Sequence, residues 1–97
     1  MSQFERMMSG LPYFGDDEIR SIMMKTRTLL FEYNNLHPEK RERKQEILRE
    51  LLGKCGERFY IEAPFRCDYG CNIELGENFY ANYNLTILDC NTSPFQL

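Results

Sequence analysis

From Ile61 to Cys90 the sequence reads IEAPFR CDYGCN IELGEN FYANYN LTILDC, five consecutive blocks of six residues. The first and third positions of every block hold an apolar or small residue, and the second and sixth positions are mostly polar. The first column is Ile61, Cys67, Ile73, Phe79 and Leu85, and the third is Ala63, Tyr69, Leu75, Ala81 and Ile87. Because side chains two residues apart in a strand share a face, each block predicts a short strand with one buried side. A corner after every strand, repeated every six residues, predicts a chain that winds into a β-helix.

An ordinary antiparallel meander is the alternative interpretation of this stretch. It would have to bring both columns into alignment by chance. Ten apolar or small residues at ten positions are hard to obtain in that way when 42% of the chain is hydrophobic. The pattern therefore favours the β-helix.

The residues before the repeat have the period of helices. Phe4, Met7 and Met8 indicate a short helical turn that stops at Gly10. Further on, the acidic run at 16–18 predicts a helix start, because side-chain oxygens can accept the free N–H groups there and negative charge suits that end. Apolar side chains then follow at steps of three and four, which indicates an amphipathic helix. They are Ile19, Ile22, Met23, Thr26, Leu29, Leu30 and Tyr33.

A second helix is predicted after the break at 34–38. Pro38 suits its first turn, since the N–H that proline lacks has no partner at that position. Its apolar end, at 47–52, precedes the stop at Gly53. The two helices form a hairpin whose apolar seam needs a surface to pack against. The sequence therefore predicts an α+β fold: a helical domain at 1–57, the first coils of an incomplete parallel β-helix at 58–90, and a divergent tail at 91–97.

The overall charge and hydropathy exclude several classes of partner. The net charge is −3 and the sequence pI is near 5.2, which argues against nucleic-acid binding. The basic run at 40–44 is interrupted by Glu42, as on a solvated helix face. No stretch has the roughly 20 apolar residues of a membrane span. The N-terminus has no pattern of a secretory signal, so we expect a cytoplasmic protein with reduced cysteines.

The four cysteines are a candidate metal site. They are Cys55, Cys67, Cys71 and Cys90, and they include no pair separated by two residues. That spacing is a weak signal for zinc. A free cysteine in an inward column serves as a small apolar residue. We therefore expect no metal.

Several segments of this chain resemble the maltose and galactoside O-acetyltransferases. In the helical part these are TLLFEYN at 28–34 and ELLG at 50–53. In the repeat they are IEAPFRCDYG at 61–70, NI at 72–73, LGEN at 75–78 and FYANYNLTILD at 79–89. The resemblance runs from about residue 3 to Cys90, and its second half is the more specific.

This resemblance implies a fold, a reaction and an assembly. The fold is a left-handed parallel β-helix with three six-residue blocks per coil, capped by the helical domain and assembled as a homotrimer. The reaction is transfer of an acetyl group from acetyl-CoA to a sugar hydroxyl. A histidine acts as general base on that hydroxyl, which requires a near-neutral pKa and hydrogen-bond reach.

The resemblance also implies which residues hold the acceptor sugar. Asn82, in the YAN motif, matches a sugar-binding asparagine, and Asp89 matches the acidic residue that closes ILD. Tyr80 and Asp68 match positions that line the same pocket, and either Asp16 or Asp17 is expected to reach the sugar. Amides and carboxylates suit vicinal hydroxyls, and an aromatic face packs on a pyranose ring. The alternative is that the Asn and Asp residues act only as turn residues, and that Tyr80 packs against a neighbouring subunit.

The catalytic histidine of the family is expected beyond the end of this chain. His37, the one histidine here, precedes Pro38 in the loop between the helices and is not expected to act as the base. Nor is the chain expected to bind acetyl-CoA tightly. From Asn91 onward the six-residue pattern is lost, since Asn91 and Ser93 stand where apolar residues belong. We therefore expect a truncated family member with an open end that favours self-association. Its function is either that of an acetyltransferase family member or that of a non-catalytic remnant that binds sugar or pairs with related subunits.

Overall fold

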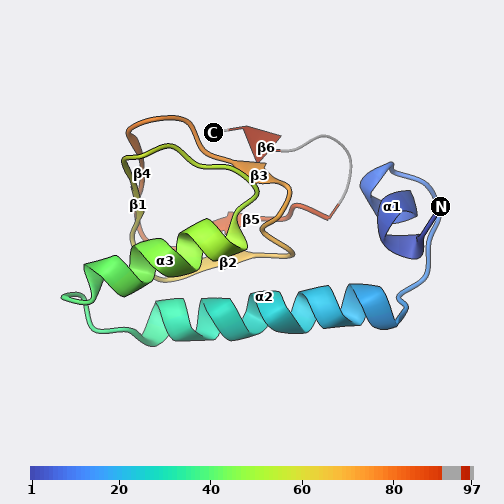
Figure 1. Ribbon diagram of the computed structural model, residues 1–97, viewed down its shortest axis with the longest axis horizontal. Helices are drawn as coiled ribbons and strands as arrows, with labels where there is room; N and C mark the ends of the chain where they lie inside the picture. Colours follow the sequence, from blue (N-terminus) through green and yellow to red (C-terminus); the bar gives the residue numbers. More distant parts are fainter. Residues whose placement is uncertain (91–94, 97) are drawn as a thin grey trace.

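A computed structural model of the chain describes residues 1–90 and the strand at 95–96. Helices come first and short strands follow, as the sequence predicts (Figure 1). The helices are α1 (Gln3–Met8), α2 (Asp17–Asn35) and α3 (Arg41–Leu51). The strands are β1 (Phe59–Ile61), β2 (Phe65–Cys67), β3 (Ile73–Glu74), β4 (Phe79–Ala81), β5 (Leu85–Ile87) and β6 (Phe95–Gln96). Within this described part, none of the helices combines the length and the apolar character that a membrane crossing requires.

The strands pair in parallel, one coil of chain apart. β1 pairs with β4, β2 with β5, and β3 with β6, which gives three two-stranded sheets. Phe59 lies beside Phe79 and Phe65 beside Leu85, so the coil advances by the same number of residues in these two sheets. Parallel pairing excludes the antiparallel meander, because a meander joins each strand to the next by a hairpin.

The six-residue register predicted for the repeat is wrong in its first two blocks. Successive strands from β1 to β5 begin at residues 59, 65, 73, 79 and 85, so the spacing is six except for eight between β2 and β3. The longer β2–β3 corner makes the coil longer than three blocks of six. The prediction began the first two blocks at Ile61 and Cys67. In the structure these residues end β1 and β2, which begin at Phe59 and Phe65. Tyr69, predicted to face inward, packs instead in a small cluster with Met7 and Ile19.

The main core lies between the helical hairpin and the coil. Ile61, Phe65 and Ile73 are completely buried, and they pack with Tyr33 of α2 and Ile47 of α3. The Tyr33 hydroxyl donates a hydrogen bond to the Ile61 carbonyl oxygen, so its one polar group is satisfied inside the core. Each of these large side chains contributes on the order of 1.5–3 kcal/mol of burial free energy. The apolar seam of the hairpin thus packs against the first coil.

The connection between α2 and α3 differs from the prediction. The sequence predicts Pro38 in the first turn of the second helix, but α3 begins only at Arg41. The amide of Lys40 donates to the carbonyl oxygen of His37 at 2.9 Å, which closes a turn with Pro38 at its second position. The restricted φ of proline suits that position of a turn as well as a helix start, so the sequence alone does not separate the two.

The C-terminal segment returns to the coil at one point. Phe95 pairs with Ile73 and Gln96 with Glu74, both in parallel. Residues 91–94 and 97 lie outside the described residues, and with them most of the tail that was predicted to leave the repeat. β6 therefore lies beside β3. Paired residues in this sheet are 22 positions apart along the chain, against 20 in the other two sheets.

Candidate functional site

The six residues predicted to hold a sugar fall into two groups that lie along different parts of α2. At its N-terminal end, Ile19 packs on Tyr69, which follows Asp68 in the β2–β3 corner. At its C-terminal end, Asn34 exchanges hydrogen bonds with the backbone of Phe65. The 19 residues of α2 span about 28 Å at 1.5 Å per residue. Asp16 and Asp17 lie at the start of α2, and the corner with Asp68, to which Asp89 is bonded, reaches α2 at Thr26, near the middle of the helix. Tyr80 and Asn82 lie toward its C-terminal end.

Asp89 is fully buried and holds the β2–β3 corner from the next coil. Its Oδ1 accepts the amide of Asp68 at 3.1 Å and that of Tyr69 at 2.9 Å. Its Oδ2 accepts the amide of Asn72 at 3.3 Å, and the Asn72 side chain donates back to the Asp89 carbonyl oxygen at 2.6 Å. The exposed fraction of Asp89 is 0%. Its carboxylate is therefore occupied by backbone donors, as a buried charge requires.

The same corner is fixed to the helices. Thr26 of α2 donates to the Tyr69 carbonyl oxygen at 2.9 Å. Gly70 has φ +82°, and a Cβ at that position would lie 2.7 Å from Leu51, so glycine is needed both for the backbone angle and for the close approach of α3. A strand-to-strand corner is thus tied to α2, α3 and the second coil at once.

Asp68 is presented by this corner, half-buried at the protein surface. Desolvation raises the pKa of its carboxyl group, and the nearby Asp89 charge raises it further. The Asp68 carboxyl group is thus easier to protonate than an ordinary aspartate. A carboxyl group in that state can donate as well as accept a hydrogen bond.

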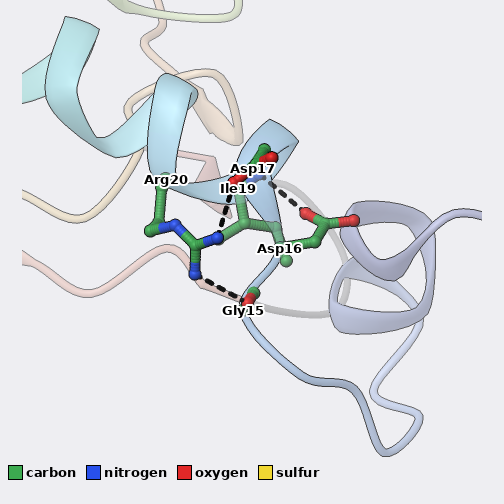
Figure 2. A network of polar contacts seen from close by, with 5 residues as sticks. All are labelled: Gly15, Asp16, Asp17, Ile19 and Arg20. Atoms are coloured by element: carbon green, nitrogen blue, oxygen red, sulfur yellow. Dashed lines mark hydrogen bonds and ion pairs between the residues drawn. The ribbon is translucent and has the colours of Figure 1, made fainter.

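Asp16 and Asp17 have different local roles, although they are neighbours (Figure 2). Asp16 is the N-cap of α2, and its Oδ1 accepts the amide of Ile19 at 3.0 Å. Asp17 is exposed and forms an ion pair with Arg20 at 2.6 Å. Arg20 also donates to the Gly15 carbonyl oxygen at 3.0 Å. Asp16 thus organises the helix start, while Asp17 keeps its carboxylate in solvent.

Tyr80 and Asn82 form the second group, on β4 and the corner after it. Tyr80 is 60% exposed, stacks on Tyr60 with ring centroids 6.4 Å apart, and donates to Glu62 at 3.2 Å. Partial desolvation and the bond to Glu62 raise the pKa of the Tyr80 hydroxyl. Asn82 is exposed, and its Oδ1 accepts the amide of Tyr83 at 2.9 Å. An aromatic face and a side-chain amide are thus exposed on one edge of the coil.

Sequence reasoning missed two residues that build the first group. The helical pattern places Thr26 in the apolar stripe of α2, and the repeat makes Asn72 a simple turn residue. Both are buried at 2% exposure. Thr26 binds the Tyr69 carbonyl oxygen in the β2–β3 corner, and Asn72 joins that corner to the Asp89 carbonyl oxygen. A polar residue in an apolar stripe was the one available signal for Thr26. No pattern in the sequence pointed from Asn72 to Asp89, because the two lie on successive coils.

The remaining candidates for chemistry lie outside both groups. His37 is exposed, and its Nδ1 accepts the amide of Glu39 at 3.1 Å within the turn between the helices. Burial raises the pKa of the Cys67 thiol, which keeps it protonated. Among residues 1–90, the cysteines are free thiols, and no three His, Cys, Asp or Glu side chains gather closely enough to hold a metal ion.

Comparisons with known proteins agree on one family. Residues 6–56 match the sequence profile of the maltose acetyltransferase hexapeptide capping motif. A Saccharomyces cerevisiae protein named as an acetyltransferase is 51% identical over 91 residues, which cover 92% of this chain and 46% of that protein. A maltose O-acetyltransferase from Clostridium difficile 630 superposes with a TM-score of 0.91 at 36% identity, over 95% of this chain and 50% of that one.

A galactoside acetyltransferase in complex with coenzyme A superposes with a TM-score of 0.86 at 34% identity, over 95% of this chain and 46% of that one. This chain thus spans about half the length of each relative. The helical cap and the coil that carries both groups of polar residues lie within the shared part. The chain belongs to the maltose acetyltransferase family of hexapeptide-repeat acetyltransferases.

Proposed function

We propose that this chain supplies the acceptor-sugar part of an acetyl-CoA-dependent sugar O-acetyltransferase, and that its coil is the start of a left-handed parallel β-helix. The observation that carries the proposal is the pair of polar groups that the fold holds in place on the coil. One group centres on Asp68 and the other on Tyr80 and Asn82. Carboxylates, amides and an aromatic face are the groups that bind pyranose hydroxyls and ring faces. The relatives named for maltose and galactoside support a sugar of that kind.

The distance between the two groups leads to the proposed assembly. Asp16 and Asp17 lie at the start of α2, which is about 28 Å long, so a single sugar ring cannot join them to Tyr80 and Asn82 toward its other end. We therefore propose a homotrimer, in which Tyr80 and Asn82 of one subunit lie next to Asp68 and Asp17 of a neighbour. In this arrangement Asp89 fixes the corner that presents Asp68, since its carboxylate accepts three backbone amides of that corner. We place the protein in the cytoplasm.

The proposed reaction needs a base that His37 does not supply. A sugar hydroxyl oxygen attacks the thioester carbonyl carbon of acetyl-CoA, the base takes the hydroxyl proton, and the CoA thiol leaves. His37 is held in a turn by Glu39, outside both polar groups. On this chain alone we expect sugar binding without acetyl transfer. A second candidate function is a non-catalytic module that binds sugar or pairs with related subunits. It is supported by the same observation, that His37 lies outside both polar groups.

Two measurements on the purified chain test the proposal. Incubation with acetyl-CoA and maltose or a galactoside, with the sugar analysed by mass spectrometry, is expected to yield no acetylated product above background. Titration of the ¹⁵N-labelled chain with the same sugars is expected to shift the amides of Asn82 and Tyr80. Asn82→Ala is expected to abolish those shifts. Asn78→Gly, at the neighbouring corner, is expected to leave them, because glycine keeps the φ of +59° that Asn78 adopts. Sugar shifts that survive Asn82→Ala contradict the assigned site, and acetylated product contradicts the role given to His37.

A further inference from the structure

A groove beside α2 carries two arginine side chains that have no partner within the described part of the protein. The groove has a volume of about 430 Å³ and lies between α2 and β2. Its lining includes Arg27, Phe31, Asn34 and Asn35 of α2 and Arg66 and Cys67 of β2. Arg66 is the central residue of β2 and is exposed, as expected for the outward-facing position of a strand. Neither group of predicted sugar residues lines this groove.

Most arginine side chains in the described part of the chain are engaged. Their partners are carboxylates, backbone carbonyl oxygens or aromatic rings. The engaged residues are Arg6, Arg20, Arg41, Arg43 and Arg49. Among residues 1–90, the side chains of Arg27, Arg58 and Arg66 make no hydrogen bond, ion pair or ring contact. Two of these three line the same groove, and Arg58 lies elsewhere.

The side-chain amides of the groove already make hydrogen bonds within the protein. Asn34 accepts from and donates to the Phe65 backbone, both at 2.9 Å. Asn35 donates to the Phe31 carbonyl oxygen at 2.8 Å. Glu32, the acidic residue beside Phe31, forms two hydrogen bonds to Arg43 at 2.6 and 2.7 Å. The charged groups left to bind a ligand are the two guanidinium groups, and the Phe31 ring in the same groove is 72% exposed.

We propose that this groove binds a phosphorylated sugar, with the phosphate between Arg27 and Arg66 and the ring against Phe31. Guanidinium groups form paired, charge-assisted hydrogen bonds to phosphate oxygens. Two cations in one groove repel each other, and an anion between them removes that repulsion. An exposed aromatic ring packs on the apolar face of a pyranose. The site is independent of the acetyl-transfer proposal, because none of its residues belongs to the two polar groups.

The test is a titration of the ¹⁵N-labelled chain with inorganic phosphate, glucose 6-phosphate and glucose at constant ionic strength. We expect saturable shifts at the amides of Phe31, Arg66 and Cys67 with both phosphates, tighter binding of the sugar phosphate, and no shift there with glucose. Arg27→Gln and Arg66→Gln are each expected to weaken both phosphates about tenfold, the scale for loss of a charge-assisted hydrogen bond. Arg58→Gln is the matched control, and we expect its affinity to stay within about twofold of wild type.

Phe31→Ala distinguishes the contribution of the sugar ring to binding from that of the phosphate. It is expected to weaken glucose 6-phosphate and to leave inorganic phosphate unchanged, because only the sugar contacts the ring. All four substitutions change exposed side chains, and the amide spectrum reports whether each variant is folded. Absence of saturable shifts at the groove amides of the wild type overturns the proposal. So does an equal loss in Arg58→Gln, which is the signature of general charge attraction, and so does sugar-phosphate binding that Phe31→Ala leaves intact.

Discussion

The carboxylate of Asp89 accepts the backbone N–H of Tyr69 at 2.9 Å, from one coil of the chain to the next. Asp68 and Asn72 donate to the same carboxylate, so three amides of one corner depend on one buried side chain. A charge without solvent contact is tolerable in a protein only when its hydrogen bonds are complete. The position of Asp68 at the surface therefore follows from Asp89 beneath it.

Asp89→Asn is expected to destabilise the chain by about 1–3 kcal/mol, because the new NH₂ group faces backbone donors and leaves one of them unsatisfied. Urea unfolding followed by circular dichroism measures the change. Asp68→Asn is the matched control. It lies in the same corner but its side chain is half exposed, and its loss at neutral pH is expected to be smaller. Equal losses in the two variants would contradict the supporting role of Asp89.

The stability of the corner is expected to depend on the protonation of Asp68. Its pKa is raised in the folded protein by burial and by Asp89, so the folded state holds this proton more tightly than the unfolded state. Its contribution to stability is then present at low pH and is lost as pH rises through the raised pKa.

The difference between wild type and Asp68→Asn isolates this contribution, because the other carboxyl groups are common to both proteins. Over about pH 3–7, the wild type is expected to lose stability relative to the variant as pH rises. Urea midpoints at a series of pH values measure this. A difference that runs in the opposite direction would show that Asp68 is stabilised in its charged form.

Gly70→Ala is expected to cost on the order of 1–3 kcal/mol or more, since φ is +82° and a Cβ would lie 2.7 Å from Leu51. Gly15→Ala is the control, because nothing lies within 4 Å of a Cβ at that position. Thermal unfolding of both variants gives the comparison. If Gly70→Ala unfolds at the wild-type temperature, α3 does not approach this corner as closely as described.

Asp16→Ala is expected to destabilise the chain by about 0.5–2 kcal/mol, the typical cost of losing a helix N-cap. Asp17→Ala removes a fully exposed partner of Arg20, and we expect little change in stability from it. For ligand binding we expect the reverse order, with Asp17 more important than Asp16. Only the Asp17 carboxylate is free of backbone donors. If a sugar is bound from this loop, Asp17→Ala is expected to weaken binding without a loss of stability, as measured by titration and unfolding of the same sample.

The helices and the presence of strands could be predicted from local pattern. The stripe from Ile19 to Tyr33 has helical period, and the acidic run at 16–18 suited the cap that Asp16 provides. Alternation in the repeat predicted strands, and their parallel pairing excludes the antiparallel meander. The family could be predicted from the motifs at 61–89, and the comparisons confirm it. The residues that bind sugar stay a prediction.

The sequence by itself determined which segments are helix or strand and which side of each is apolar, because periods of 3.6 and 2 are local properties of the chain. Only the tertiary structure decided the register of the coil, since the longer β2–β3 corner is set by Asp89, Thr26 and Leu51, which lie far away in the sequence. It also decided which polar residues face solvent. Asp89 and Asn82 are similar in sequence terms, but stacking of one coil on the next buries the first and leaves the second exposed.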